Sequence, residues 1–136
     1  MFTYERKVHF EEVDAAGIVF FGRYLNYAHE AMEAFFGALE GGYEGLIMVR
    51  RVGFPAVHVT IDYRAPLRYG DRLGIDVDIT KIGKTSVVLR YGMVRQDGVD
   101  VATVEHTCVC SDLRGPSKIA FPDDVRALLQ KHLVTS

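Results

Sequence analysis

The sequence has no tryptophan and only two cysteines, Cys108 and Cys110, among its 136 residues. The two cysteines lie two positions apart in a stretch that resembles a strand. Their side chains then share a face, but an extended backbone does not favour a disulfide between them. A metal or redox centre built on cysteine would need further thiols, and the sequence offers none. We therefore expect both cysteines to be small buried residues.

Long apolar runs and an excess of one charge are also absent. No run approaches the roughly 18 apolar residues that a membrane-spanning helix needs, and the first residues lack the basic-then-apolar order of a signal peptide. We expect no membrane span and a cytoplasmic location. The formal net charge of −2 argues against nucleic acid as the main partner. A local cluster of arginines and lysines could still hold an anionic ligand.

The residues that are present fit one folded domain over residues 1–136, since 49% are hydrophobic and 25% are charged. Residues 4–11 predict a strand. Residues 22–39 predict a helix, because apolar side chains recur there at steps of three and four, and we expect Gly41-Gly42 to end it. The recurring apolar residues are Leu25, Ala28, Met32, Phe35, Phe36 and Leu39.

Alternating apolar residues predict further strands over 57–63, 73–79, 87–93 and 100–112. Asp97-Gly98 is a hairpin signal, and Pro122-Asp123-Asp124 predicts the start of a C-terminal helix. The order β-α-β-β-β-β-α favours an α+β fold, with an antiparallel sheet wrapped around the early helix. Because several strands have apolar or small residues on both faces, we expect a second copy to cover the outer face and so a homo-oligomer, a dimer or tetramer.

Asp14 stands where a short apolar strand ends and a small, flexible segment leads into the first helix. This arrangement can hold a carboxylate beside the free amides of a helix N-terminus. The carboxylate can then attack a substrate or activate water, while the amides bind a developing negative charge. Gly17 permits close approach of the backbone to a ligand. From the spacing alone, Asp14 could equally be a turn or capping residue, and Gly17 an ordinary turn glycine.

The run Asp14-Ala15-Ala16-Gly17-Ile18-Val19-Phe20-Phe21, followed by Tyr24 and Tyr27, resembles the active-site signature of the 4-hydroxybenzoyl-CoA thioesterase family. The resemblance is specific over residues 10–30 and follows the element order from about residue 4 to residue 112. It implies a hotdog fold, in which a five-stranded antiparallel sheet wraps around a long central helix. It also implies dimers that pair their sheets, alone or as a homotetramer of two such dimers, and an active site at the subunit interface.

The resemblance further implies that the chain hydrolyses an acyl-CoA thioester to a free acid and coenzyme A. Asp14 would be the nucleophile or general base, and the backbone amide of Phe21 would bind the carbonyl oxygen. Ala15 replaces the proline or glycine that the family often has after the aspartate. Thioester carbonyls are weakly stabilised and thiolates leave readily, so a carboxylate plus one oxyanion-binding amide can suffice. No cofactor is implied, because coenzyme A is part of the substrate.

Coenzyme A has phosphates that suit basic side chains. The resemblance implies basic residues in the turn over residues 81–85, where Lys84 matches, and Arg64 is a second candidate. His29 and Glu33 share a helix face. Glu30 or Glu33 could supply a catalytic carboxylate, whereas His29 is expected to be a packed or water-linked core histidine. A metal site is not expected, because no third ligand is visible. The partners of His58, Asp62 and His106 on their strands cannot be read from the sequence.

The acyl group is left open between aromatic, short-chain and long-chain, and the thioester donor between coenzyme A and an acyl carrier protein. The apolar side chains that could form an acyl pocket could equally belong to the core; they are Phe20, Phe21, Phe35, Phe36 and Phe54. A dehydratase of the same fold is disfavoured because no paired histidine and acid stand out. The main alternative is a non-catalytic acyl-CoA-binding or assembly module. Asp14 favours the enzyme, since a binding module needs no carboxylate at the thioester carbonyl.

Overall fold

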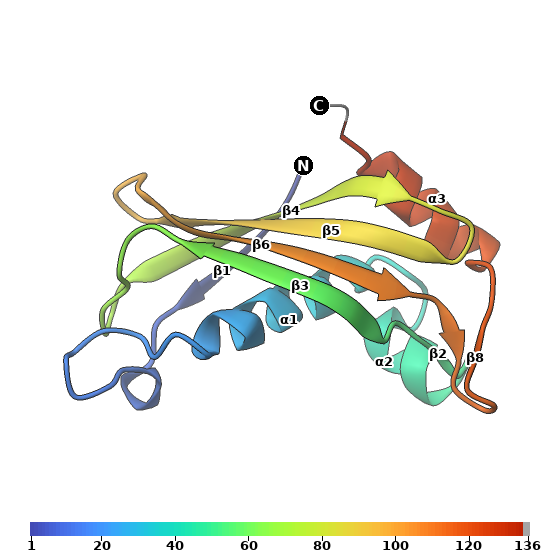
Figure 1. Cartoon of the computed structure of the whole chain (residues 1–136), viewed down its shortest axis with the longest axis horizontal. Coiled ribbons are helices and arrows are strands. Elements are labelled where there is room, and N and C mark those ends of the chain that lie inside the picture. Colours follow the sequence, from blue (N-terminus) through green and yellow to red (C-terminus); the bar gives the residue numbers. More distant parts are fainter. Residues whose placement is uncertain (135–136) are drawn as a thin grey trace.

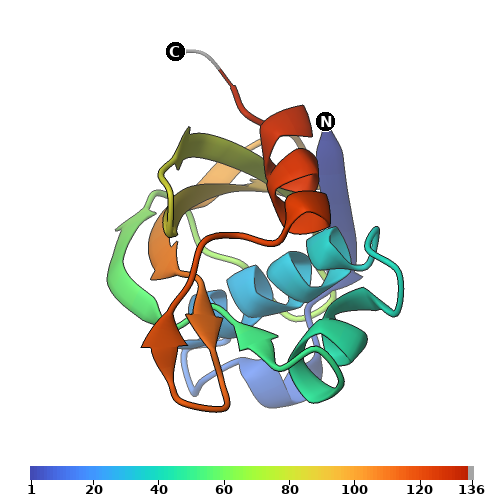
Figure 2. The same cartoon turned by 90° about the vertical axis from the view of Figure 1, so that its right-hand side faces the viewer.

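The computed structural model describes residues 1–134. These residues form two sheets, three α-helices and one 3-10 helix (Figures 1 and 2). The elements are, in chain order, β1 (Phe2–Lys7), the 3-10 helix η1 (Phe10–Glu12), α1 (Arg23–Phe36), α2 (Gly42–Met48), β2 (Val52–Gly53), β3 (Ala56–Tyr63), β4 (Arg72–Ile82), β5 (Ser86–Arg95), β6 (Asp100–Val109), β7 (Ser111–Asp112), β8 (Ser117–Lys118) and α3 (Asp123–Lys131).

The main sheet has five antiparallel strands in the order β1-β4-β5-β6-β3. In Figure 1 this sheet curves over α1, which lies along its concave face. The predicted α+β hotdog architecture, with the sheet wrapped around a long central helix, is confirmed. β1 and β3 form the two edges, so β3 ends the sheet with an unpaired side.

The core lies between the concave face of the sheet and α1. Along β4 the buried residues are Leu73, Ile75, Val77 and Ile79, and β5 shows the same alternation. From α1, Phe36 is fully buried, and its ring stacks on Phe54 with centroids 4.9 Å apart. The buried faces of the strands, which repeat every two residues, thus pack against the buried face of the helix, which repeats every 3.6 residues, in one apolar layer.

The outer face of the sheet differs from expectation. The residues that alternate with the buried ones on β4 are Gly74, Asp76, Asp78 and Thr80. Asp78 pairs with Arg90 of β5 at 3.1 Å, and Asp76 accepts a hydrogen bond from the Thr3 hydroxyl at 2.6 Å. This face is polar and largely self-paired, so it does not itself demand a second copy to cover it. Exposed apolar side chains lie instead on β3, where Val57 is 61% exposed.

The first strand was predicted over residues 4–11 but ends at Lys7. The chain then turns into η1, and the reason is Glu12. Its carboxylate accepts hydrogen bonds from the backbone N–H of His9 at 2.8 Å and from the Arg6 guanidinium at 2.7 Å. A side chain that binds the backbone three residues earlier favours a tight turn over an extended strand.

The end of the long helix was predicted at Gly41-Gly42, which is also wrong. The helix α1 stops at Phe36, with Gly37 as its C-terminal cap. Gly41 and Gly42 have φ values of 79° and 64°, a left-handed conformation that reverses the chain direction. They introduce α2, a helix of seven residues that the sequence did not reveal and that packs against α1.

The last long strand, predicted over residues 100–112, is broken at Cys110. That residue donates its backbone N–H to Thr85 at 2.7 Å, and the chain continues as β7 in a small second sheet of order β2-β7-β8. Cys108 and Cys110 are buried free thiols, as predicted. Within residues 1–134, no helix has the length and apolar character needed to cross a membrane.

The C-terminal helix α3 begins at the predicted acidic residues Asp123 and Asp124. It packs beside the end of β4, where the Ile79 N–H donates to the carbonyl of His132 at 3.1 Å (Figures 1 and 2). This helix closes the end of the sheet that lies away from the residue 8–22 segment.

Candidate functional site

Asp14 lies at one end of a tight hairpin formed by residues 13–19. Val13 bridges Val19, and the Asp14 N–H donates to the Ile18 carbonyl at 2.9 Å. The Ala16 N–H donates to Asp14 Oδ1 at 2.8 Å, while no described residue binds Oδ2. The side chain of Asp14 is thus exposed, fixed by one oxygen and free at the other.

Gly17 provides the backbone conformation of this hairpin. Its φ is +80°, and its N–H closes the turn onto the Asp14 carbonyl at 2.9 Å. A Cβ built on Gly17 would meet no atom within 4 Å, so space does not require glycine here. The positive φ does require glycine, because a residue with a side chain is strained in the left-handed conformation.

Phe21 precedes the first turn of α1, and no described residue accepts a hydrogen bond from its N–H. The helix has no side-chain cap at Gly22 and no acidic residue in its first turn. The Arg23 N–H donates to the Phe20 carbonyl at 2.9 Å, so the Phe21 N–H, unlike that of Arg23, is left for an anion at this end of the helix. The Tyr63 hydroxyl donates to the Phe21 carbonyl at 2.9 Å and thereby ties β3 to the start of the helix.

A hollow of about 330 Å³ lies beside Phe21, between the start of α1 and the end of β3. Its walls include Tyr24, Tyr63 and Arg64, but not Asp14. The Tyr24 and Tyr63 rings meet edge to face at 5.1 Å, and Arg64 donates to the Thr103 hydroxyl at 2.7 Å. The structure therefore places Arg64 in the wall of the same hollow as Phe21.

Lys84 stands apart from this group within one chain. It lies in the turn between β4 and β5, and its carbonyl accepts a hydrogen bond from Arg126 of α3. β4 runs 11 residues from the side of the Asp14 hairpin to that turn, which is roughly 35 Å at the usual rise of a strand. Within one protomer, Lys84 and Asp14 are therefore at opposite ends of β4.

A buried charged cluster supports the hairpin and was missed by the sequence analysis. It consists of Arg6, Glu12, Tyr27 and Glu30. The Arg6 guanidinium binds Glu12 at 2.7 Å and Glu30 at 2.6 Å, and the side chains of Arg6 and Glu12 are each only 8% exposed. The Tyr27 hydroxyl donates to Glu12 at 2.9 Å. The signal was available in the acidic run Glu11-Glu12, but nothing in one sequence placed Arg6 opposite it.

This cluster fixes the protonation of Glu12. Burial alone would raise the pKa of the carboxyl, but the hydrogen bonds from the His9 N–H and Tyr27, together with the Arg6 charge, lower it overall. Since the Phe20 N–H donates to the Glu12 carbonyl at 3.0 Å, the backbone of this charged residue also holds the second arm of the hairpin.

The remaining candidates separate into core and surface. Phe35, Phe36 and Phe54 are core residues, whereas Phe20 and Phe21 are largely exposed. His29 and Glu33 form a weak, exposed contact of 3.9 Å. No group of three potential metal ligands occurs among residues 1–134.

His58 and His106 are not opposite one another, because Val59 is the residue that faces His106 across β3 and β6. Asp62 pairs with Thr103 and is exposed. His106 instead contacts Tyr91 of β5 on the concave side of the sheet. The register between strands decides these contacts, and a single sequence does not reveal it.

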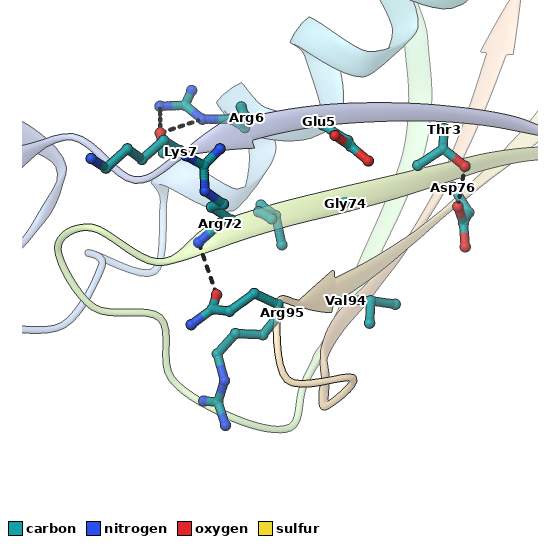
Figure 3. Close-up of a pocket in the computed structure, with 11 residues that line it drawn as sticks. Thr3, Glu5, Arg6, Lys7, Arg72, Gly74, Asp76, Val94 and Arg95 are labelled. Carbon is teal, nitrogen blue, oxygen red and sulfur yellow. Dashed lines mark hydrogen bonds between the residues drawn. The ribbon is translucent and has the colours of Figure 1, made fainter.

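A larger hollow, about 600 Å³, lies elsewhere, on the outer face over β1, β4 and β5 (Figure 3). Gly74 in its floor has no side chain to fill it, and its rim mixes acidic Glu5 and Asp76 with basic Lys7 and Arg72. The lining includes none of the predicted site residues, so this hollow is not part of the candidate site.

Comparison with known proteins agrees with the fold. Residues 8–129 match the model of the thioesterase-like superfamily. A 1,4-dihydroxy-2-naphthoyl-CoA hydrolase of Nostoc punctiforme is 34% identical over 125 residues, which cover 91% of this chain and 83% of that protein.

Two solved structures with related descriptions share the fold. A 1,4-dihydroxy-2-naphthoyl-CoA thioesterase from Synechocystis is 29% identical with a TM-score of 0.86, covering 95% of each chain. A gentisyl-coenzyme A thioesterase is 28% identical with a TM-score of 0.81, covering 91% of this chain and 98% of the other. The prediction of a thioester-hydrolysing enzyme acting on acyl-CoA is confirmed, while the narrower resemblance to 4-hydroxybenzoyl-CoA thioesterases stays a prediction. The chain belongs to the thioesterase-like superfamily of hotdog enzymes.

Proposed function

We propose that this chain, as a single hotdog domain, hydrolyses an aromatic acyl-CoA at the Asp14 hairpin and the start of α1. The observation that supports this most directly is the pairing of a fixed carboxylate with an uncapped helix start. Asp14 Oδ2 is free to act while Oδ1 is held by the Ala16 N–H, and the Phe21 N–H has no acceptor among the described residues.

Asp14 acts on the thioester carbonyl in one of two ways. It attacks the carbonyl carbon itself, or it accepts a proton from an attacking water. The negative charge that develops on the carbonyl oxygen is stabilised by the Phe21 N–H and the dipole of α1. Tyr63 supports this geometry, because its bond to the Phe21 carbonyl fixes the segment that presents the amide. Gly17 serves by shaping the hairpin and not by touching the substrate.

An aromatic acyl group is proposed from the relatives. The names of the similar proteins specify dihydroxynaphthoyl and gentisyl groups, both of which are hydroxylated aromatic acids attached to coenzyme A. A benzoyl group with a hydroxyl substituent, such as 4-hydroxybenzoyl, is the smallest substrate of this kind. Arg64 at the rim of the hollow beside Phe21 would meet the phosphates of coenzyme A.

A homodimer that pairs β3 with β3 of a second copy would complete the site. β3 is an eight-residue edge strand with no internal proline, and none of its side chains is fully buried, which is the form of strand that pairs with another chain. Antiparallel pairing about a two-fold axis sets opposite ends of the two sheets side by side. The partner's β4–β5 turn would then lie near the Asp14 hairpin, which would give Lys84 a role that it lacks within one chain.

The compartment and higher assembly follow from the same proposal. Free, buried Cys108 and Cys110 suit a reducing cytoplasm. A tetramer of two such dimers would use the polar outer faces of the sheets, where charged pairs rather than apolar side chains would meet.

The test is release of free thiol from benzoyl-, hydroxybenzoyl-, short-chain and long-chain acyl-CoAs by the wild type and by Asp14→Asn. The variant keeps the size of the side chain and a hydrogen-bond acceptor for the Ala16 N–H, so the hairpin should fold. We expect turnover on the aromatic thioesters and a loss of at least about 100-fold in kcat in the variant. Circular dichroism and chain mass in solution serve as the controls for folding and assembly.

Near-normal turnover in Asp14→Asn would refute the assigned role of Asp14. Turnover confined to aliphatic thioesters would refute the proposed acyl group. Tight binding of an aromatic acyl-CoA with no turnover by the wild type would instead support the binding-module alternative.

A further inference from the structure

A second, smaller cavity of about 140 Å³ lies between α1 and the concave face of the sheet. Its walls are mostly apolar and come from Leu25, Ala28, Val59 and Val104. The polar groups in it are few. His106 and Tyr91 lie on the sheet side, and His29 lies at the rim on α1.

The position of this cavity suits the acyl group of the proposed substrate. Leu25 comes four residues after Phe21, a distance of about 6 Å along a helix, and His29 comes about 6 Å further. A carbonyl oxygen at the Phe21 N–H would therefore direct its acyl substituent along the 25–29 face of α1, into the space in front of β3. Val59 of β3 closes the opposite wall.

The volume of the cavity limits the group that it can hold. An apolar cavity of about 150 Å³ in a protein interior accommodates a benzene molecule. The cavity here, at about 140 Å³, matches one aromatic ring. A second fused ring would have to extend through the open side past His29, whose side chain is 59% exposed.

The hydrogen bond between Tyr91 and His106 determines what the cavity can recognise. The Tyr91 oxygen and His106 Nδ1 are 3.2 Å apart, and Tyr91 is almost fully buried. Burial raises the pKa of the Tyr91 phenol, which therefore keeps its proton. No other described acceptor is within reach of this hydroxyl, so donation to Nδ1 is the arrangement that gives the phenol proton a hydrogen bond. In a neutral imidazole the proton must then be on Nε2.

The surroundings keep His106 neutral. Burial and the nearby His29 lower the pKa of His106, so at pH 7 its ring is uncharged. No described residue accepts a hydrogen bond from Nε2, and no buried side-chain nitrogen or oxygen of the described residues lacks a partner, so Nε2 is accessible to a ligand in the apolar cavity that His106 lines. An oxygen atom on the bound ring would satisfy it, whereas an unsubstituted ring would leave it unpaired.

We propose that His106 is a specificity-determining residue, which selects acyl groups with an oxygen substituent on the aromatic ring by donating a hydrogen bond from Nε2 to that oxygen. Tyr91 is the positioning residue that sets the required tautomer. This inference rests on the proposed function, because it assumes that the acyl group of the thioester enters this cavity.

The test compares benzoyl-CoA with 2-, 3- and 4-hydroxybenzoyl-CoA, using the wild type, His106→Phe and His106→Gln. In the wild type, kcat/KM for the best hydroxylated substrate should exceed that for benzoyl-CoA by about tenfold, the effect of one good hydrogen bond between uncharged groups. His106→Phe keeps an aromatic ring but has no donor, and it should reduce this ratio to about one. His106→Gln retains an N–H donor and should restore part of the ratio.

His29→Phe is the matched control, because it replaces the other histidine of the same cavity. It should leave the ratio between hydroxylated and plain substrates unchanged. A ratio that changes in His29→Phe and not in His106→Phe would overturn the assignment. Equal losses on all four substrates in His106→Phe would mean that His106 only supports the fold.

A binding measurement separates this inference from the proposed function. The probes are the non-hydrolysable thioethers S-phenacyl-CoA and S-(4-hydroxyphenacyl)-CoA with its 2- and 3-hydroxy isomers, titrated by calorimetry. If the wild type hydrolyses none of the benzoyl thioesters but prefers a hydroxylated probe, and His106→Phe loses that preference, His106 has the proposed role and the proposed hydrolysis is wrong. Equal affinity of the wild type for all four probes would overturn the inference.

A spectroscopic measurement tests the role of Tyr91. The ¹⁵N spectrum of the histidines in the wild type should show His106 with its proton on Nε2. In Tyr91→Phe this preference should weaken, and the preference for the hydroxylated probe should fall with it. A His106 ring with its proton on Nδ1 in the wild type would contradict the proposal.

Discussion

At the residue scale, the site depends on a few atoms whose orientation is set by the backbone. Asp14 is held by one carboxylate oxygen, and Phe21 by its carbonyl. In both residues the atom that the proposed chemistry uses is the one left without a partner in the described structure. Neither residue depends on an unusual neighbouring side chain for its proposed role. The exposed hairpin leaves the Asp14 carboxylate in contact with water, and the helix start supplies the Phe21 amide.

We predict that Gly17→Ala destabilises the protein by about 1 kcal/mol, the cost of placing a side chain in the left-handed region. Because the Gly17 N–H closes the turn on Asp14, the variant should also lose part of its kcat. Urea denaturation and thiol-release assays measure the two effects.

Gly92→Ala is the control for this prediction. A Cβ at Gly92 also meets no atom within 4 Å, but the φ of this residue is not positive. The control should be at least as stable as the wild type. A Gly17→Ala variant as stable as Gly92→Ala would show that the hairpin does not require the left-handed conformation.

The candidate site residues that the sequence predicted are those that depend on local geometry. Asp14, Gly17 and Phe21 fall within eight positions, and a hairpin leading into a helix brings them together without help from distant strands. The sequence did not reveal His106, whose contact with Tyr91 depends on the register between β5 and β6, or Arg6, whose partners come from η1 and α1. Long-range register is invisible to periodicity, because every shift by two residues preserves the same alternating pattern.

At the element scale, the buried cluster of Arg6, Glu12, Tyr27 and Glu30 joins three elements. β1 supplies Arg6, η1 supplies Glu12, and α1 supplies Tyr27 and Glu30. The Arg6 guanidinium also lies over the Tyr27 ring, 4.3 Å from its centroid. The cluster therefore fixes the place where the hairpin leaves the sheet and where the helix passes beneath it.

We predict that Glu12→Gln lowers the free energy of unfolding at pH 7 by about 3 kcal/mol, because it removes one charge from a buried pair. The effect should also depend on pH. The folded-state pKa of Glu12 is lowered, so its contribution is fully present above its unfolded pKa of about 4.5 and is lost as pH falls through the folded value.

The measurement is chemical denaturation of both proteins between pH 7 and pH 3. The gap in stability between the wild type and Glu12→Gln should narrow below about pH 4.5. Glu11→Gln is the control, since its neighbouring carboxylate is exposed and outside the cluster. A gap that stays constant across this range would mean that the ionised Glu12 does not stabilise the fold.

The helix and strand boundaries show how far local patterns predict elements. The alternation along β4 and β5 predicted both strands well, because each strand has one buried face. The double glycine was read as a stop signal, yet the same left-handed conformations here begin a new helix. Whether a glycine ends one element or starts another depends on what the next segment packs against, and α2 packs on α1.

At the scale of the whole molecule, the distribution of exposed apolar side chains is uneven. The outer face of the sheet is polar, whereas β3 exposes Val57, Val59 and Tyr63 next to its free edge. The sequence predicted an apolar outer face that a second copy would cover, whereas the exposed apolar side chains lie on β3. The free edge and the exposed valines together favour strand pairing over the stacking of sheet faces.

We predict that the wild type is a homodimer or larger even-numbered assembly at micromolar concentration, and that Val57→Lys shifts it towards the 15.2 kDa monomer. A lysine on the free edge would be repelled by its counterpart and would lose the apolar contact. Light scattering measures the mass, and thiol release measures the activity. Val99→Lys is the matched control, because Val99 is also an exposed valine but lies outside β3.

The activity of the Val57→Lys monomer then decides whether the site is shared between subunits. Lys84 lies at the opposite end of β4 from the Asp14 hairpin, so only a partner could bring a lysine from that turn to the bound coenzyme A. A monomer with a raised KM for the acyl-CoA and a folded core would support a shared site. A monomer with unchanged KM and kcat would refute it, and a Val57→Lys variant that keeps the mass of the wild type would exclude β3 as the interface.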